Sequence, residues 1–444
     1  MPTLPSRRLP SLPASLPEGA RGARAGRRLA GAAGLVLLAL AGPAAGAGLP
    51  RLAGVPVAGF AFAGMGADGR LFAHVEGGAE LAPDGTILRP LAPETPMRVA
   101  SISKVVVALA ILRLADRGQL DLDADAARAL GRPLRNPSHP HVPVTIRQLL
   151  RHESSLSDAG GYAATLGTRL EDMLGPRVWS QSAPGTAFDY ANLNSVVLAT
   201  IVEMQTGLRF DRAARALVLD PLGIEGCFNW SDCGPGVAAM GAVLYRKSAD
   251  HGASWQPDGP WVPQVDGERP PDGCPVRPAP GRPCDLATYL PGTNGGLFAP
   301  QGGLRISILE LARLGQALLA NRNGFLKPET HAALFRPRAV APGGAGAETD
   351  TRLMRFWSEG GLHCFSGTGE AGTDQPLAPL AMAGCGHLGE AYGLFSALVM
   401  DPARGTVRAW AVTGSGDRPP PGTRSRFNAL EEELATRAFQ THAP

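Results

Sequence analysis

Ser101 and Lys104 are the two residues of this sequence whose types and spacing most directly allow chemistry. A serine hydroxyl is a weak nucleophile and needs an adjacent proton acceptor. Two side chains three positions apart on a helix share one face. Arginine supplies almost every cation of this chain, yet position 104 is a lysine, which can lose its proton when desolvated. The pair predicts a serine nucleophile; the plain alternative is that Ser101 caps a helix and Lys104 is solvated.

A second candidate pair is Tyr190 and Asn192, which follow the turn residues Pro184-Gly185. A nearby ammonium favours the phenolate of a tyrosine, so Tyr190 is a candidate general base beside Lys104. Asn192 offers a donor and an acceptor, either to a substrate amide or to Lys104. Taken alone the pair is weak evidence, because most such tyrosines simply pack with a satisfied hydroxyl.

A third candidate segment runs from Gly386 to Gly393 and contains His387, Gly389 and Glu390. Glycine in a strand lets another backbone approach closely, as a bound substrate would require. A lone histidine in such a segment is more often structural than catalytic. We therefore predict a substrate-binding strand edge, in which His387, Gly389 and Glu390 are the candidate contacts.

The elements that must position these residues follow from apolar periodicity. Strands are predicted near both ends of the chain and helices in the middle. This order predicts an α+β fold, in which N- and C-terminal strands form one antiparallel sheet flanked by helices and a mostly helical lobe is inserted. The predicted strands cover 55–63, 70–75, 393–400 and 407–413, and the predicted helices cover 101–117, 194–206, 308–320 and 428–439.

The first 47 residues have the pattern of a secretory signal peptide. Several arginines precede an uncharged apolar run over 29–40, and Ala45-Gly46-Ala47 is a small-residue cleavage pattern. An uncleaved membrane anchor is the alternative. Cleavage predicts a periplasmic or secreted protein. The segment carries six arginines and one acid, so its removal changes the formal net charge of the chain from +3 to a slightly negative value. A chain with that charge is not expected to bind nucleic acid.

The remaining length exceeds the usual limit for a single core and predicts two lobes. We assign residues 48–120 and 290–444 to an α/β lobe and residues 121–289 to a helical lobe. The Pro-, Gly- and Trp-rich stretch at about 226–289 has no periodic apolar face, so we expect a stapled loop insertion there.

Six cysteines fit an oxidising compartment and up to three disulfides. The connectivity cannot be read from the sequence, but proximity favours Cys227 with Cys233, Cys274 with Cys284, and Cys364 with Cys385. The spacings of the Cys and His residues do not match a metal site, so neither a metal nor another cofactor is predicted.

Together the candidate segments resemble a known family. In order along the chain they are Ala100-Ser101-Ile102-Ser103-Lys104, Leu149-Leu150-Arg151-His152-Glu153-Ser154, Pro184-Gly185, Tyr190-Ala191-Asn192, Gly302-Gly303-Leu304 and His387-Leu388-Gly389. This order and spacing resemble the serine β-lactamase-related family, which comprises class C β-lactamases, D-Ala-D-Ala carboxypeptidases and family VIII esterases. The resemblance covers about residues 60–435 and is interrupted by the Cys-rich insertion.

The resemblance implies that Ser101 is acylated and that Lys104 and Tyr190 share the proton transfer. It implies that Asn192 orients the substrate and that the N–H groups of Ser101 and Glu390 form the oxyanion hole. Which of Lys104 and Tyr190 takes the proton stays open.

Two departures from the family pattern matter. The class C enzymes have Lys-Thr-Gly where this chain has His387-Leu388-Gly389, so a fixed cation and a hydroxyl are missing. This favours esters or amides without a carboxylate over β-lactams or D-Ala peptides. Ser155 stands where the family has glycine, and we expect an effect on a turn only.

The resulting prediction is an exported serine hydrolase that acts on a small ester, amide or D-amino-acid peptide. The membrane is a partner only through the signal peptide during export. A β-lactamase or a penicillin-binding D-Ala-D-Ala carboxypeptidase is the first alternative. The second is a non-catalytic binding protein on the same fold, with Trp230, Trp255 and Trp261 of the insertion as a recognition surface.

Overall fold

The computed structural model describes residues 48–341, 350, 352–377, 381–416 and 418–441. The predicted signal peptide over 1–47 lies outside the described residues. Those that are described belong to one compact unit, and the division into an α/β lobe and a helical lobe stays a prediction. Within this part of the chain, no helix is both long enough and apolar enough to cross a bilayer.

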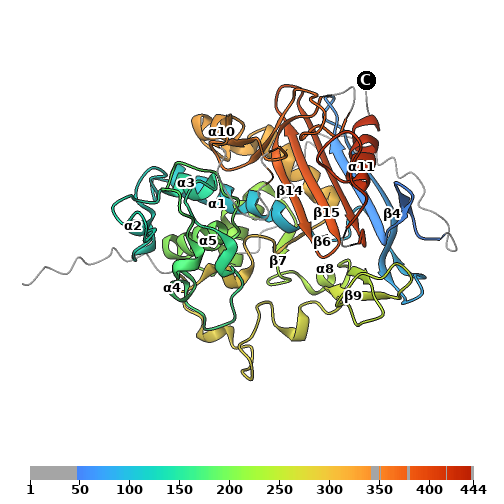
Figure 1. Cartoon of the computed structure of the whole chain (residues 1–444), viewed down its shortest axis with the longest axis horizontal. Helices are drawn as coiled ribbons and strands as arrows, with labels where there is room; N and C mark the ends of the chain where they lie inside the picture. Colours follow the sequence, from blue (N-terminus) through green and yellow to red (C-terminus); the bar gives the residue numbers. More distant parts are fainter. Residues whose placement is uncertain (1–47, 342–349, 351, 378–380, 417, 442–444) are drawn as a thin grey trace, which may run out of the picture. The chain divides into compact units, whose positions relative to one another are not determined.

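The centre of the fold is an antiparallel sheet of nine strands, in the order β11-β12-β13-β14-β15-β16-β3-β4-β5. The N-terminal strand β3 pairs with the C-terminal strand β16, so strands from both ends of the chain lie side by side (Figure 1). The predicted fold class is therefore confirmed. The strands are β3 (Gly59–Met65), β4 (Leu71–Leu81), β5 (Ile87–Pro90), β11 (Pro337–Ala339), β12 (Phe356–Ser358), β13 (His363–Ser366), β14 (Ala383–Ala391), β15 (Leu394–Asp401) and β16 (Thr406–Thr413).

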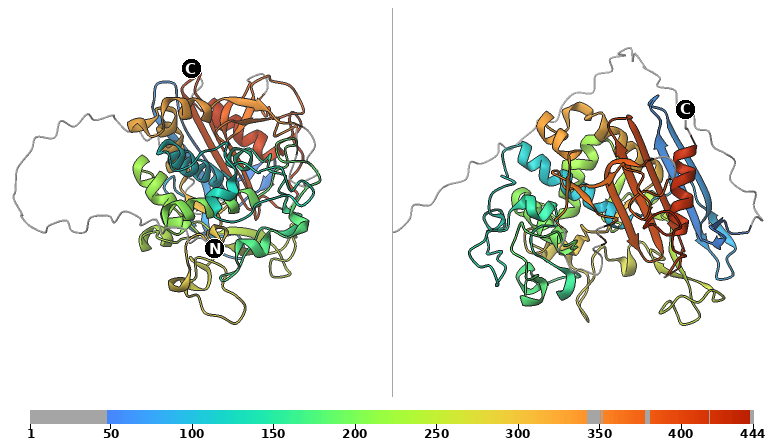
Figure 2. Two further views of the ribbon diagram at one scale, coloured as in Figure 1. Left: turned by 90° about the vertical axis from the view of Figure 1, so that its left-hand side faces the viewer. Right: turned by 45° about the horizontal axis from the view of Figure 1, so that its top comes forward.

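Side chains of the central strands alternate between two cores, as a sheet covered on both faces requires. In β16, Val407, Ala409 and Ala411 point into the large core on the side of helices α1 (Ser103–Asp116) and α9 (Ile308–Leu319), whereas Trp410 and Val412 point into a second core. The second core is closed by the C-terminal helix α11 (Ala429–Gln440), which lies against the sheet (Figure 2). The sheet is thus a middle layer with helices on both faces.

The helices bear out the predicted pattern closely. Helix α1 begins after a short 3-10 turn, η1 (Ala100–Ile102), and is buried almost all round, which makes it a core helix and not a surface one. The predicted helices at 194–206, 308–320 and 428–439 correspond to α5, α9 and α11. The α-helices are α1 (Ser103–Asp116), α2 (Ala126–Leu130), α3 (Ile146–Leu150), α4 (Leu170–Met173), α5 (Leu193–Thr206), α6 (Phe210–Ala214), α7 (Asp220–Leu222), α8 (Pro235–Ala239), α9 (Ile308–Leu319), α10 (Pro328–Leu334) and α11 (Ala429–Gln440).

The insertion at 226–289 is more ordered than the expected stapled loop. It contributes β7 to a three-stranded sheet, β6-β10-β7, and forms its own hairpin from β8 and β9. The prediction missed these strands because β7 has only three residues, while β8 ends in two charged residues and β9 contains a proline, so that none of them shows a clear alternation. The strands outside the large sheet are β1 (Arg51–Leu52), β2 (Val55–Pro56), β6 (Met97–Arg98), β7 (Gly226–Phe228), β8 (Leu244–Lys247), β9 (Trp261–Val265) and β10 (Leu304–Ile306).

The three predicted disulfides are confirmed. Cys227 is bonded to Cys233 and Cys274 to Cys284, both within the insertion, and Cys364 is bonded to Cys385 across β13 and β14. The pairing by nearest neighbours holds because each bridge closes a short local loop.

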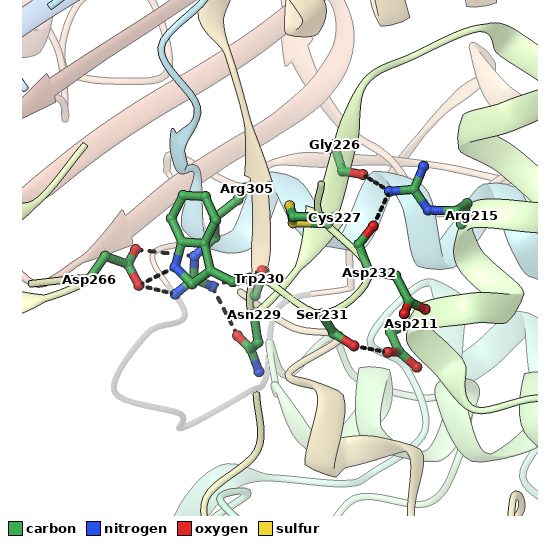
Figure 3. The surroundings of a disulfide bond; sticks show 12 residues. Asp211, Arg215, Gly226, Cys227, Asn229, Trp230, Ser231, Asp232, Asp266 and Arg305 are labelled. Carbon is green, nitrogen blue, oxygen red and sulfur yellow. Dashed lines mark hydrogen bonds and ion pairs between the residues drawn. A yellow bond between two sulfur atoms is a disulfide. The ribbon is translucent and has the colours of Figure 1, made fainter. Parts of the chain in front are cut away.

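A buried ion pair also fastens the insertion to the rest of the fold. Asp266 accepts hydrogen bonds from Nε and Nη2 of Arg305 in β10, at 3.1 and 2.8 Å, and from the indole N–H of Trp230 at 2.8 Å (Figure 3). Trp230 and Trp261 are both only 4% exposed. The expected tryptophan recognition surface is therefore wrong for these two residues, because the Trp230 ring lies against Arg305 and the Trp261 ring packs against Ala58 and Leu81.

Removal of one partner from this ion pair should be costly. We expect Asp266→Asn to lower the free energy of unfolding by about 3–5 kcal/mol, because Arg305 would be left as an uncompensated buried charge. Denaturant unfolding measures the loss. The control is Asp232→Asn, which breaks the more exposed pair with Arg212 in the same region and should cost less than about 1 kcal/mol. Equal losses in the two variants would contradict the assignment.

Candidate active site

Ser101 lies in the short turn η1, between strand β6 and helix α1. The preceding residue, Ala100, has a φ of 46°, a left-handed conformation that a residue with a Cβ adopts only at some cost. Ser103 holds this turn, since its hydroxyl donates to the Ala100 carbonyl at 2.6 Å and accepts from the Leu304 N–H at 2.9 Å. Neighbouring residues therefore fix the Ser101 backbone.

Lys104 is buried, with 5% of its surface exposed. Its Nζ donates to Ser101 Oγ at 2.9 Å, to Asn192 Oδ1 at 2.7 Å and to the Gln301 carbonyl at 3.1 Å. Three acceptors suit the three protons of an ammonium group. The predicted contact between Ser101 and Lys104 is present, and the reading of Lys104 as a solvated surface residue is excluded.

Asn192 is oriented by Asp158, a residue that the sequence did not single out. Asp158 Oδ2 accepts from the backbone N–H and from Nδ2 of Asn192, at 2.8 and 2.9 Å, while Oδ1 accepts from the Leu193 N–H at 3.0 Å. A carboxylate accepts and does not donate, so it holds the amide nitrogen of Asn192 and leaves the amide oxygen facing Lys104. No sequence spacing links positions 158 and 192, which only the fold brings together.

Tyr190 is 5% exposed, and its ring centroid lies 4.9 Å from Lys104 Nζ. The ring stacks on His152 at 4.5 Å. His152 also holds the chain on either side of Tyr190: its carbonyl accepts from the Asp189 N–H and its Nδ1 from the Ala191 N–H. Tyr190 is therefore fixed beside Lys104 by a histidine from the second family-like segment.

His152 is neutral in this setting. Complete burial, and secondarily the positive charge of Lys104, hold the pKa of His152 well below its ordinary value. Trp357 of β12 contacts the edge of the His152 ring, with centroids 4.9 Å apart, and donates to the Leu150 carbonyl at 3.0 Å. Trp357 supports the site from a distant segment that the sequence analysis did not identify.

Ser155, which stands where the family has glycine, has a φ of 65°. This is the left-handed region that glycine adopts without strain. The Ser155 hydroxyl accepts from Asn136 Nδ2 at 3.1 Å, away from the nucleophile. The substitution thus falls on a turn, in line with the expectation.

Gly389 brings strand β14 close to the nucleophile. A Cβ at this position would collide with the Val99 carbonyl and the Ser396 hydroxyl and would lie 3.3 Å from the backbone nitrogen of Ser101. Glu390, the next residue, lines the same cavity as Ser101. The two backbone segments expected to supply the oxyanion hole are therefore neighbours.

His387 lies behind the site and does not line the cavity. It is 2% exposed, and its ring contacts the edge of Trp357 at a centroid distance of 5.6 Å. Burial, and then the charge of Lys104, keep the pKa of His387 far below its ordinary value, so the ring is neutral. The predicted direct contact between His387 and substrate has no geometric support, because the side chain points to the interior.

Ser101 opens into a cavity of about 1300 Å³. One wall comes from the catalytic segments, with Ser101, Asn192, Gln301 and Glu390. The other wall comes largely from residues 263–278 of the insertion. Among the described residues, no group of three or more His, Cys, Asp or Glu side chains is arranged to hold a metal ion.

The sequence profile of the Beta-lactamase family matches residues 57–432. Esterase EstB of Burkholderia gladioli is 34% identical over 282 residues, which are 59% of this chain and 65% of EstB. Penicillin-binding protein 4* of Bacillus subtilis is 30% identical over 164 residues, which are 35% of this chain and 34% of that protein. The matches thus span less than two thirds of the length of either relative.

Solved structures show the same fold. The D-amino acid amidase of Ochrobactrum anthropi SV3, complexed with D-phenylalanine, aligns with a TM-score of 0.56 and 19% identity, over 80% of this chain and 86% of the amidase. The penicillin-binding protein homologue of Pyrococcus abyssi aligns with a TM-score of 0.55 and 20% identity, over 85% and 72% of the two chains. Because the family profile covers most of the sequence, from the first long strand to the last helix, this chain belongs to the β-lactamase family.

Proposed function

We propose that this protein is an exported serine hydrolase that cleaves small esters or amides through an acyl-enzyme on Ser101. One observation carries the proposal: Ser101 Oγ lies 2.9 Å from the Nζ of the buried Lys104, at the wall of a large cavity. A serine needs an adjacent proton acceptor to become a nucleophile, whereas a serine that only caps a helix needs none.

In the proposed reaction, Ser101 Oγ attacks the substrate carbonyl carbon and its proton passes to the Lys104–Tyr190 pair. The N–H groups of Ser101 and Glu390 donate to the oxygen of the tetrahedral intermediate. The carbon–oxygen or carbon–nitrogen bond then breaks, and the leaving group departs as an alcohol or amine with the transferred proton. Water attacks the acyl-enzyme by the same route and restores the Ser101 hydroxyl.

The relatives support an ester or amide substrate. EstB is described as an esterase, the D-aminopeptidase of Gluconobacter oxydans is 27% identical over 175 residues, and a D-amino acid amidase shares the fold. The relatives also include penicillin-binding proteins. The strand that carries His387 gives no cation for a carboxylate, which favours the esterase and amidase alternatives over the penicillin-binding one.

The proposed export rests on two observations. Residues 1–47 have the pattern of a cleavable signal, and all six cysteines form disulfides. Disulfides persist in the periplasm and outside the cell and are rare in the cytosol.

Ser101 should be the only residue that is acylated. Wild type and Ser101→Ala are exposed briefly to a penicillin and, separately, to a p-nitrophenyl ester, and intact mass and p-nitrophenol release are measured. We expect ester turnover by the wild type and none above background by Ser101→Ala. Full activity of the variant would overturn the assignment.

The penicillin result separates the alternatives. An adduct on the wild type alone places the substrate among penicillin-like amides, whereas ester cleavage without an adduct places it among esters and simple amides. Absence of both would support a non-catalytic binding protein.

Lys104 should not be replaceable by arginine. Lys104→Arg keeps the charge but cannot take part in proton transfer, so we expect kcat for the p-nitrophenyl ester to fall by about 100-fold or more. The matched control is Lys247→Arg, a lysine of strand β8 whose Nζ bonds the Pro257 carbonyl. The control should stay within about twofold of the wild type. Equal activity of the two variants would remove Lys104 from the mechanism.

Asp158 should act as a positioning residue through Asn192. In Asp158→Asn, one acceptor oxygen becomes an NH2 group, so at least one of the three hydrogen bonds that Asp158 accepts from Asn192 and Leu193 is lost and the Asn192 amide is held less firmly against Lys104. We expect kcat to fall about tenfold, since misorientation by a small angle is costly in a catalytic site, while the melting temperature changes little. Asp172→Asn, at an exposed acid of helix α4, is the control. A fall in stability that parallels the fall in kcat would indicate a structural role only.

A further inference from the structure

Tyr392 is an exposed aromatic residue of the cavity that the proposed mechanism does not use. It lines the same cavity as Ser101, two residues after Glu390, and 45% of its surface is exposed. The other aromatic residue among the described lining residues is Tyr162, whose side chain packs against the large core. Tyr392 is therefore the more exposed of the two aromatic rings that a bound molecule meets in this cavity.

Tyr392 and Gly393 form the two-residue loop between strands β14 and β15. Ala391 pairs with Leu394 across this loop, and Tyr392 and Gly393 have φ angles of 56° and 69°. Two positive φ angles are typical of a type I′ hairpin turn, whose central positions favour asparagine, aspartate and glycine. A tyrosine takes the left-handed conformation only at a cost in free energy, because its Cβ crowds the backbone. An asparagine would suit this turn better, so the presence of a tyrosine needs another explanation.

The hydrogen bonds that hold the turn do not involve the tyrosine ring. The Tyr392 carbonyl accepts from Nε2 of Gln264 in strand β9 at 3.2 Å, in the amide orientation that also lets Gln264 accept from Arg246. The Gly393 carbonyl accepts from the backbone N–H and the hydroxyl of Ser415, at 3.0 and 2.9 Å. Both acceptors are backbone atoms of the turn, which every residue type carries. An asparagine at position 392 would keep these bonds.

The Arg98 guanidinium holds the Tyr392 ring in place. The Arg98 Cζ lies over the ring, 5.1 Å from its centroid. At this distance a guanidinium is attracted to the face of an aromatic ring. A ring that is already fixed on one face loses little freedom when a ligand contacts the rest of it, which favours binding.

The stacked pair also stands next to the nucleophile. A Cβ on Gly302 would lie 3.2 Å from Arg98 Nη2 and 3.8 Å from the carbonyl carbon of Ala100, to which the Ser101 nitrogen is bonded. Arg98 and the Ser101 turn are therefore neighbours across Gly302, and Tyr392 lies on Arg98. A substrate whose carbonyl is at Ser101 has the groups attached to that carbonyl close to this ring.

The charges of the cavity do not select for a substrate of either sign. The charged residues among the described lining residues are three arginines and three carboxylates, namely Arg98, Arg277, Arg305, Asp266, Glu268 and Glu390. A lining in which the two signs are equal in number attracts neither anions nor cations by its net charge. The exposed aromatic ring is therefore a better basis for substrate choice than the charge.

We infer that Tyr392 is a specificity-determining residue whose ring binds an aromatic group of the substrate while Ser101 reacts with the ester or amide carbonyl. The substrate class is an uncharged ester or amide with an aromatic ring near the scissile bond, on the acyl side or on the alcohol or amine side. Two aromatic rings attract each other in offset-stacked or edge-to-face arrangements beyond the burial of their area, which a saturated ring does not reproduce. This inference rests on the proposed function.

The test compares esters that differ only in whether a ring is aromatic or saturated. For the acyl side these are the p-nitrophenyl esters of phenylacetic acid and cyclohexylacetic acid. For the alcohol side they are benzyl acetate and cyclohexylmethyl acetate, with release of acetic acid measured. The wild type should favour the aromatic member of one pair by about three- to tenfold in kcat/KM, and the pair in which it does so identifies the side.

Tyr392→Asn should abolish this preference without lowering the melting temperature, because asparagine suits the turn and only the ring is lost. Tyr392→Phe keeps the ring and should keep the preference. The ratio of the two kcat/KM values cancels any general loss of activity. The control is Leu290→Asn, at a residue that is 72% exposed and is not among the lining residues of the cavity, and this variant should leave the preference unchanged.

A second measurement needs no catalysis. The Ser101→Ala protein is titrated with N-benzylphenylacetamide, which carries an aromatic ring on each side of its amide, and with the counterpart in which both rings are saturated. The aromatic amide should bind more tightly, and the additional substitution Tyr392→Asn should remove the difference. This result, in a wild type that cleaves none of the esters, would overturn the hydrolase proposal and keep the aromatic site.

Three results would overturn the inference and leave the hydrolase proposal standing. They are ester cleavage without a preference in either pair, a preference that Tyr392→Asn leaves intact, and a preference that Tyr392→Phe removes. If Tyr392→Asn does not fold, equal inhibition of p-nitrophenyl acetate hydrolysis by the two amides in the wild type would also overturn it.

Discussion

The burial of the Lys104 ammonium is the constraint on which the site depends. A lysine with 5% exposure must have its protons accepted, and the acceptors come from three separate segments: Ser101, Asn192 and the Gln301 carbonyl. Helix α1, helix α5 and the segment before β10 must therefore converge on one point. The same requirement explains Asp158, which turns the oxygen of Asn192 and not its nitrogen toward the ammonium.

Close backbone contacts then set the second half of the site. Strand β14 approaches the Ser101 turn so closely that position 389 has no room for a Cβ. Ala100 takes a left-handed conformation in that turn, which costs free energy. The Ser103 hydroxyl holds this conformation, because it donates to the Ala100 carbonyl and accepts from the Leu304 N–H. The aromatic rings of His152, Tyr190 and Trp357 fill the space behind Lys104. Burial, and then the positive charge of Lys104, hold the pKa values of His152 and His387 well below their ordinary value, so both rings are neutral.

The sequence predicted what depends on local spacing. Ser101 and Lys104 are three residues apart, the long strands and helices have clear periods, and the disulfides close short loops. It could not predict Asp158 or Trp357, which reach the site only through the tertiary fold. It also assigned His387 to the substrate because the family segment suggested it, whereas the alternation of strand β14 turns that side chain inward. The short strands of the insertion were not predicted, because three to five residues are too few to show an alternation of apolar and polar side chains.

The cavity has two walls with different physical origins. The wall that holds Ser101, Lys104 and Asn192 is built on core helices, and a change there disturbs the packing of the whole fold. The wall over 263–278 belongs to an insertion that two internal disulfides close and that the Arg305–Asp266 pair fastens to strand β10, and few of its apolar side chains lie in the core. Side chains of this wall can be substituted with little effect on the position of Ser101. In the proposed hydrolysis, residues of the first wall would carry out the reaction, and the wall over 263–278 would contribute to the choice of substrate.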